Sequence, residues 1–248
     1  MTILEKAYYV IGIVSAAVTG VSVIIALKNY LFNKSVVKIQ KSIELLSYYK
    51  DNILNYGYAI RSVNDNSGMN KELSAIKISS SSMFNSVELH RFKIDEEKID
   101  KIYKSQDFVK SVFEANNEYN LKLPISIVKQ EEDKEAKQRI ITFDMRPTCK
   151  TFMEKVGYET LNNLEYFASH FRHGVADETV AYNSLHQTYI PLVENLYYQI
   201  AQTNKEALDG YYSNVIYLYK EWKCKQDKAY KESDKISDEV KPKTTIIK

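Results

Sequence analysis

The feature that most constrains this chain is an uncharged stretch at its start. Residues 7–27, AYYVIGIVSAAVTGVSVIIAL, contain no charged side chain, and no comparable stretch follows. At ~1.5 Å rise per residue, a helix of this length matches the ~30 Å hydrocarbon core of a bilayer. The sequence therefore predicts a single transmembrane helix, with an anchor over residues 1–33.

A retained anchor is favoured over a cleaved signal peptide. The apolar run is longer than a signal peptide requires, and Glu5 and Lys6 leave the start almost neutral. Lys28, Lys34, Lys38 and Lys41 follow the span, with no acidic residue among residues 28–41. Because basic residues stay on the cytoplasmic side, we expect a single-pass protein of the cell membrane whose soluble domain faces the cytoplasm. Two cysteines are no disulfide framework, and they suit a reducing compartment.

A helical stalk is predicted over residues 34–63. Apolar residues recur there at alternating spacings of three and four, although Lys50 and Gly57 fill two in-phase positions: Val36, Ile39, Ile43, Leu46, Ile53 and Ile60. Two uses of this stripe compete. It either joins two copies as a coiled coil or packs on the chain's own domain. The turn-forming residues 64–68 predict its end.

The remaining chain predicts a mainly α domain over residues 64–230. Its composition is that of a folded protein, with 44% apolar and 27% charged residues. Alternating residues near 121–145 predict a small β-hairpin with a charged loop. From Thr148 to about Tyr230 the helical periodicity and the short connections predict a C-terminal antiparallel bundle. Thr151 is expected to cap its first helix, Gly174 to end it and Asp177 to start the second. Residues 231–248 are predicted to be a disordered tail.

No catalytic motif is recognisable, so we expect neither an enzyme nor a cofactor. The sequence has no phosphate-binding glycine loop, nucleophile elbow or Cys-x-x-Cys pair. His170 and His173 are one helical turn apart, and with His186 they are the only candidate metal set. Zinc sites usually include cysteine or a firm ligand spacing, so histidines at helix ends or facing solvent are the expectation, with no metal.

The net charge is only +2, so any nucleic-acid binding must come from local basic patches. The candidate residues surround the predicted hairpin and begin the helix after it: Lys122, Lys129, Lys137, Arg139, Arg146, Lys150 and Lys155. Arginine is scarce here, and it can pair with a phosphate through two donors. The alternative is a solvated charged surface.

The segments TLNNLEYFASHFRHGVADETVAYNSLH and YYSNVIYLYKEWK carry a resemblance. With the single span and the basic stretch after it, they resemble small bacterial and prophage membrane-anchored proteins, and most of all lactococcal abortive-infection proteins. The matching positions are Leu161, Asn162, Glu165 and Trp222. The resemblance implies phage resistance through a membrane-tethered domain that binds nucleic acid. The nucleic acid is expected to be single-stranded, and a phage component of unknown identity is expected as a further partner.

Two other functions stay open on the sequence. One is a scaffold for other membrane proteins that does not bind nucleic acid, which an exposed apolar groove would favour. The other is a toxin-like hydrolase, which a pocket gathering the three histidines with a carboxylate would favour.

Overall fold

A computed structural model describes residues 3–75, 81–92, 96–122, 145–205 and 210–240. It describes their side chains except at 3–17, 73–75, 81, 96 and 234–240. Every element among these residues is a helix, which confirms the mainly α prediction. The predicted hairpin falls almost entirely on residues 123–144, outside the described residues, and no strand occurs at Leu121 or Lys122.

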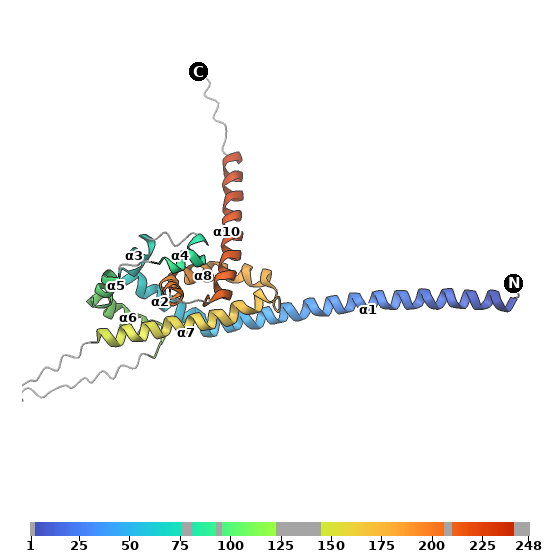
Figure 1. The fold of residues 1–248 in the computed structure, drawn as a ribbon, viewed down its shortest axis with the longest axis horizontal. Helices are drawn as coiled ribbons and strands as arrows, with labels where there is room; N and C mark the ends of the chain where they lie inside the picture. The colour runs from blue at the N-terminus through green and yellow to red at the C-terminus, as the bar shows by residue number, and fades with distance from the viewer. Residues whose placement is uncertain (1–2, 76–80, 93–95, 123–144, 206–209, 241–248) are drawn as a thin grey trace, which may run out of the picture.

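The N-terminal helix is much longer than the span. Helix α1 (Ile3–Tyr49) passes through a π-helical turn, η1 (Lys50–Leu54), into α2 (Asn55–Asn66). Tyr49 and Leu54 at the two junctions both have helical backbone angles, so the chain continues without a break. Figure 1 shows α1 as a straight rod whose first half projects far from the domain. The helix ends at the predicted turn, where Gly68 has φ +80°.

The inner part of this long helix packs on its own domain. Ser42, Leu45 and Tyr49 are buried, and Ile53 and Ile60 are buried further along. Gly57 interrupts the apolar stripe because α2 and α8 (Glu178–Asn195) approach closely there. A Cβ at position 57 would lie only 3.0 Å from Leu192 Cδ2. The buried face runs through Tyr49, which leaves Lys50 exposed. Packing on the domain is therefore observed from about Lys38 onward on one face of the helix, while the coiled-coil alternative stays a prediction for the exposed face that carries Val36, Ile39 and Ile43.

Shorter helices build one end of the domain. They are α3 (Met69–Ala75), the 3₁₀ turn η2 (Ser81–Phe84), α4 (Ser86–His90), α5 (Glu96–Tyr103) and α6 (Gln106–Tyr119). Ser105 caps α6 by accepting from Phe108 N at 3.1 Å. Helix α6 packs on α2, and α5 packs on α6 and α7. Ile99, Phe108 and Val112 are buried, as their spacing predicted.

Four helices complete the core: α7 (Arg146–Arg172), α8 (Glu178–Asn195), α9 (Tyr197–Asn204) and α10 (Ser213–Val240). Gly174 (φ +64°) follows α7, and Asp177 caps α8 by accepting from Thr179 N and Val180 N, both as predicted. The predicted cap at Thr151 is wrong, because α7 starts earlier, at Arg146, and Thr151 lies exposed within it. Helix α10 continues to Val240, so residues 231–240 of the predicted disordered tail are helical.

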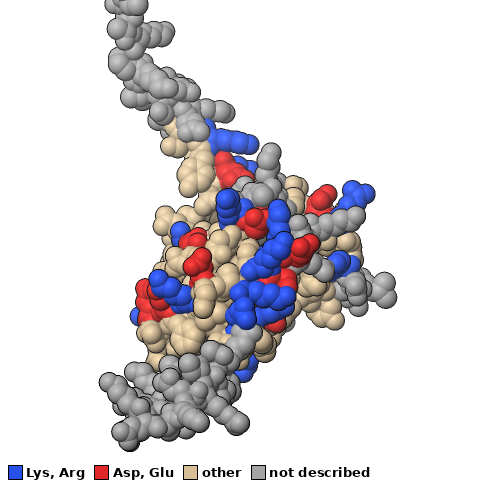
Figure 2. Space-filling model, turned by 90° about the vertical axis from the view of Figure 1, so that its left-hand side faces the viewer, with Lys and Arg blue, Asp and Glu red and all other residues tan. Residues whose placement is uncertain are grey.

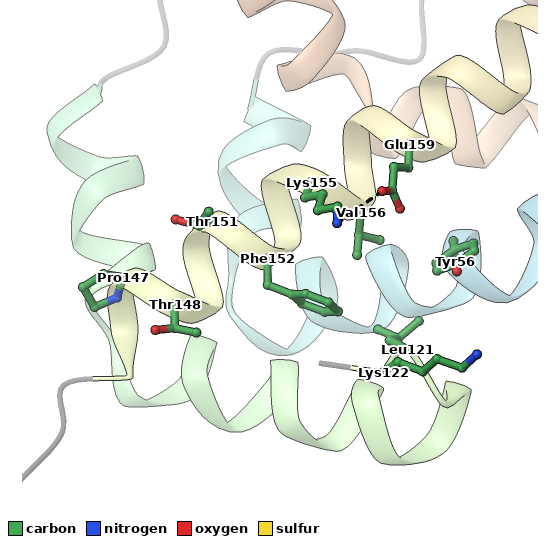
Figure 3. Close-up of a pocket in the computed structure, with 10 residues that line it drawn as sticks. All are labelled: Tyr56, Leu121, Lys122, Pro147, Thr148, Thr151, Phe152, Lys155, Val156 and Glu159. Carbon is green, nitrogen blue, oxygen red and sulfur yellow. Dashed lines mark ion pairs between the residues drawn. The ribbon is translucent and has the colours of Figure 1, made fainter. Parts of the chain in front are cut away.

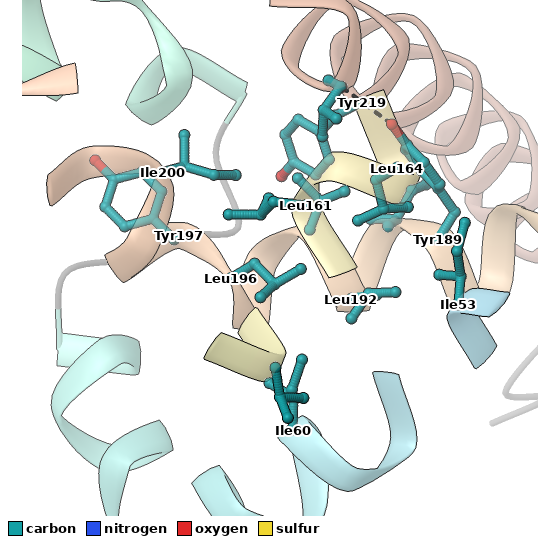
Figure 4. Packing of buried hydrophobic residues seen from close by; sticks show 14 of the residues in the cluster. Ile53, Ile60, Leu161, Leu164, Tyr189, Leu192, Leu196, Tyr197, Ile200 and Tyr219 are labelled. Atoms are coloured by element: carbon teal, nitrogen blue, oxygen red, sulfur yellow. Dashed lines mark hydrogen bonds between the residues drawn. The ribbon is translucent and has the colours of Figure 1, made fainter. Parts of the chain in front are cut away.

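A chain of aromatic contacts joins the four long helices. Tyr49 of α1 meets Phe167 of α7 at 5.2 Å between ring centroids, and Phe167 lies 6.1 Å from Tyr189 of α8. Tyr189 in turn lies 4.8 Å from Trp222 of α10. Figure 4 shows aliphatic side chains filling the space between these helices and α9. The predicted packing of the C-terminal helices is thus present, although Figure 1 shows α10 crossing α7 rather than running antiparallel to it.

Among the described residues, no helix is both long enough and apolar enough to cross a membrane. The predicted span begins among residues 1–17, whose side chains lie outside the described ones.

Candidate nucleic-acid interface

The predicted basic residues divide into two groups. Lys129, Lys137 and Arg139 lie outside the described residues. The others flank that segment: Lys122 is exposed just after α6, and Arg146, Lys150 and Lys155 lie on the first three turns of α7. The start of α7 is therefore where the described candidates gather.

Helix α7 begins without a side-chain cap. Met145 occupies the N-cap position and offers no side-chain acceptor, and Pro147 follows in the first turn. Met145 O accepts the first helical bond from Cys149 N at 2.9 Å. The free amide groups and the helix dipole leave partial positive charge at such an end. This charge adds to that of Arg146, which is exposed.

The turn after α5 adds one basic residue, Lys104, that was not among the predicted candidates. Arg146 Nη1 donates to Lys104 O at 3.5 Å, which brings α5 against the start of α7. Lys150 Nζ lies 5.1 Å from the centroid of the Tyr103 ring, a cation–π contact. Figure 2 looks onto this end of the domain, where basic side chains gather with acidic ones among them. We name Lys104, Arg146 and Lys150 the basic cluster.

One carboxylate shares the basic cluster. Lys104 Nζ forms an ion pair with Asp100, one turn earlier on α5. The hydrogen bond from Lys104 lowers the pKa of Asp100, and the charges of Lys104 and Lys150 lower it further. Three positive charges thus meet the negative charge of Asp100, and the charge of Glu154, four residues after Lys150 on α7, also acts on Tyr103. Elsewhere on this end the pairing is one to one, as in Lys101–Glu97 (2.9 Å) and Lys110–Glu114 (3.8 Å).

A groove of about 700 Å³ adjoins the basic cluster along α7. Figure 3 shows Phe152 and Val156 of α7 pointing into it, opposite Leu121 after α6 and Tyr56 of α2. Polar side chains line its rim, among them Lys122, Thr148 and Thr151. Lys155 and Glu159, at its edge, form an ion pair of 3.6 Å. The groove offers an apolar floor with a mixed polar rim, which suits an apolar segment better than a phosphate.

The candidate metal ligands do not converge. Among the described residues, no three His, Cys, Asp or Glu side chains are placed to hold a metal ion. His170 Nδ1 lies 2.9 Å from Tyr166 O, and His186 Nδ1 lies 2.7 Å from Tyr182 O. Each ring thus contacts the backbone of its own helix, and His173 is exposed at the end of α7.

Two of the residues that carry the family resemblance, Glu165 and Trp222, join helices of the domain to one another. Glu165 Oε1 accepts from Asn214 N (3.1 Å) and Glu165 Oε2 accepts from Val215 N (3.0 Å), so the carboxylate caps the start of α10 from α7. Trp222 is fully buried and donates to Glu178 Oε1 at 3.1 Å. Asn162 is exposed.

No known protein family matches this sequence, and no curated protein or solved structure is similar to it.

Proposed function

We propose that the chain is a membrane-anchored antiphage protein of the abortive-infection kind, whose domain binds nucleic acid and so interferes with phage replication. The observation that carries the nucleic-acid part is the basic cluster at the uncapped start of α7. Arg146 and Lys150 project from the first two turns of α7, and Lys104 joins them from the turn that follows α5. A helix start with cations beside it is a favourable environment for a phosphate. Single-stranded nucleic acid is the expected ligand, because exposed aromatic rings such as Tyr158 can stack with unpaired bases.

The membrane part of the proposal is supported by the composition of α1. Residues 18–37 are all exposed, and Lys28 and Lys34 are the only charged residues among them. In the proposed arrangement residues 7–27 cross the membrane once, and the lysines after them hold the domain in the cytoplasm. The hairpin near residues 121–145 is part of the same proposal and would extend the basic cluster with Lys129, Lys137 and Arg139.

Orientation is testable at Cys224, which is exposed on α10, because Cys149 is buried. In intact spheroplasts a membrane-impermeant maleimide should leave Cys224 unlabelled, and permeabilisation should allow labelling. Labelling of Cys224 before permeabilisation would reverse the topology and move the function outside the cell.

The nucleic-acid proposal is tested by a binding titration of the detergent-solubilised full chain with single- and double-stranded DNA and RNA. Each phosphate contact contributes roughly −0.7 to the salt slope for single strands. Changing Lys104, Arg146 and Lys150 together to Gln should therefore flatten the slope by about 2. The same triple variant should abolish phage resistance and keep its helical content.

A charge-matched control changes Lys220, Lys228 and Lys231 of α10 to Gln, and it should bind and protect like the parent. If the cluster variant protects as well as the parent, the basic cluster is not the site. If the parent does not bind even at low salt, the nucleic-acid proposal fails.

A second candidate function is a scaffold without a nucleic-acid role, and the groove beside α7 favours it. Phe152, Val156 and Leu121 would offer an apolar floor to a peptide or helix of another protein. Phe152→Asp should then abolish protection while leaving nucleic-acid binding unchanged, the opposite pattern to that of the cluster variant. Neither proposal includes an enzymatic step, a metal or a cofactor.

A further inference from the structure

The domain covers only one face of α1. Ser42, Leu45 and Tyr49 are buried against it. Ser42 Oγ accepts from Asp177 N at 2.7 Å, and Asp177 N also lies 3.4 Å from Lys38 O. These bonds fasten the start of α8 to α1, so contact with the domain begins at about Lys38 and on this face.

A second face of α1 carries a regular apolar stripe that the domain leaves exposed. We call Phe32, Val36, Ile39 and Ile43 the seam; their exposed fractions are 67%, 45%, 39% and 58%. The spacings of four, three and four residues are those of a heptad repeat. Because successive helical residues are about 100° apart, Ile43 points well away from Ser42. The seam and the domain contact are therefore different faces of one helix.

The charges near the seam are placed to allow close approach of a second helix. The positions beside the seam carry the uncharged Asn33, Ser35, Gln40 and Ser42, of which Ser42 is buried against the domain. Lys34 and Lys41 lie on the opposite side of the helix, about half a turn away. Two copies that meet along the seam thus bury no lysine, and their like charges stay in solvent.

The straight course of α1 argues for a second copy and against a lipid surface. An amphipathic helix that rests on a membrane lies in the plane of the interface. Figure 1 instead shows residues 28–43 continuing in line with the residues before them. If residues 7–27 cross the bilayer, Phe32 lies at the edge of the headgroup region, about 7.5 Å beyond Leu27, and the seam from Val36 onward stands outside the lipid. Figure 1 also shows no other described part of the chain beside residues 18–37, all of which are exposed.

We propose that the chain forms a parallel homodimer in which the seams of two copies pack together. The parallel direction rests on the proposed membrane anchor, since two copies inserted the same way present the seam at the same height. The seam spans only about two heptads, fewer than the three to four that identify a sustained coiled coil. Anchoring in one membrane raises the effective concentration of the copies and compensates for this shortness.

The test uses the full chain in native membranes, with Cys224→Ser to remove the exposed thiol. Val36→Cys and Ile39→Cys are compared with the matched controls Lys34→Cys and Val37→Cys, which replace exposed residues outside the seam. Disulfide formation requires a Cβ–Cβ distance of about 3.8 Å. Mild oxidation should therefore give at least about tenfold more disulfide-linked dimer for the seam variants than for the controls. Equal cross-linking on both faces, or none at the seam, would overturn the proposal.

A second variant separates packing from chance collision in the membrane. Val36→Glu combined with Ile39→Glu introduces like charges into the seam, and it should suppress cross-linking at Ile43→Cys by about tenfold. Helical content and the amount in the membrane fraction should not change. Undiminished cross-linking at Ile43→Cys in this variant would contradict the proposal. Nucleic-acid binding is not part of either readout, so failure here is distinct from failure of the proposed function.

Discussion

Two helices of this protein extend beyond the same domain, and their projecting parts have opposite chemistry. The N-terminal arm, residues 18–37, contains only two charged residues among twenty, and all of them are exposed. On the C-terminal arm, residues 224–233, five of ten residues are charged and only Gln226 is half-buried. Figure 1 shows the arms leaving the domain in different directions.

This difference in composition means that the N-terminal and C-terminal arms are stable in different surroundings. Charged residues along the C-terminal arm keep their hydration in water, as in Lys225, which also pairs with Glu178 at 2.5 Å near the domain. The N-terminal arm exposes large side chains such as Ile24 and Phe32, whose hydration is unfavourable by ~25 cal/mol per Å² of apolar surface. We therefore expect lipid or a partner protein to cover the N-terminal arm, whereas the C-terminal arm needs no such cover.

The largest effect is expected where α10 enters the core. Trp222→Ala removes a fully buried ring that contacts Tyr189 and donates to Glu178, and it should reduce the free energy of unfolding by about 3–5 kcal/mol. Tyr230→Ala on the C-terminal arm, where the ring is 63% exposed, should change it by less than about 0.5 kcal/mol. Denaturant titration measures both. Similar losses for the two variants would mean that the C-terminal arm is not solvent-exposed.

An intermediate effect is expected at alkaline pH, and it reports on the core alone. Burial raises the pKa of Tyr197 to about 12, and also raises the pKa of Tyr49, Tyr189 and Tyr219. A raised pKa stabilises the fold below the ordinary tyrosine pKa of about 10, and this contribution is lost as the pH rises above that value. For Tyr197 alone the loss by pH 12 is on the order of 1–2 kcal/mol once partial solvent screening is allowed for.

Tyrosinate absorbance and near-ultraviolet circular dichroism, followed together between about pH 9 and 12, measure this loss. We expect the late tyrosine ionisation to coincide with loss of tertiary structure. Ionisation of all tyrosines near pH 10, with the fold intact, would contradict the burial of these rings.

A smaller effect is expected where α2 meets α8. Gly57→Val adds a side chain where even a Cβ would lie 3.0 Å from Leu192 Cδ2, and overpacking of this kind costs about 1–3 kcal/mol. The same change at Gly20, where no atom lies within 4 Å, is the matched control on the N-terminal arm. A destabilisation no greater at position 57 than at position 20 would show that α2 does not pack closely on α8.

The sequence predicted the local features of the fold well. Gly174 and Asp177 act as their chemistry predicts, and the predicted turn is present at Ser67 and Gly68, because a cap or a turn depends on a few neighbouring residues. The predictions were wrong or incomplete where a contact between residues far apart in the sequence determines the structure. Tyr49 rather than Lys50 faces the core because η1 shifts the helical phase, and the carboxylate that caps α10 comes from Glu165 on α7.

The candidate site was predictable only in part. Arg146 and Lys150 stand out as basic residues near the start of a predicted helix. Lys104 joins them only because α5 packs against α7, a contact between segments about 40 residues apart in a sequence that carries no motif for it. The Tyr103 ring beneath Lys150 depends on the same contact.

The central claim is that the N-terminal arm and the span before it hold this protein in a membrane while the domain and C-terminal arm stay in water. The most direct measurement is fractionation of cells that express the full chain, with a membrane wash at about 1 M salt, where charges are screened beyond ~3 Å. The full chain and a truncation after Cys224 should stay in the membrane pellet, and deletion of residues 1–27 should release the protein. Recovery of the full chain in the soluble fraction would contradict the account.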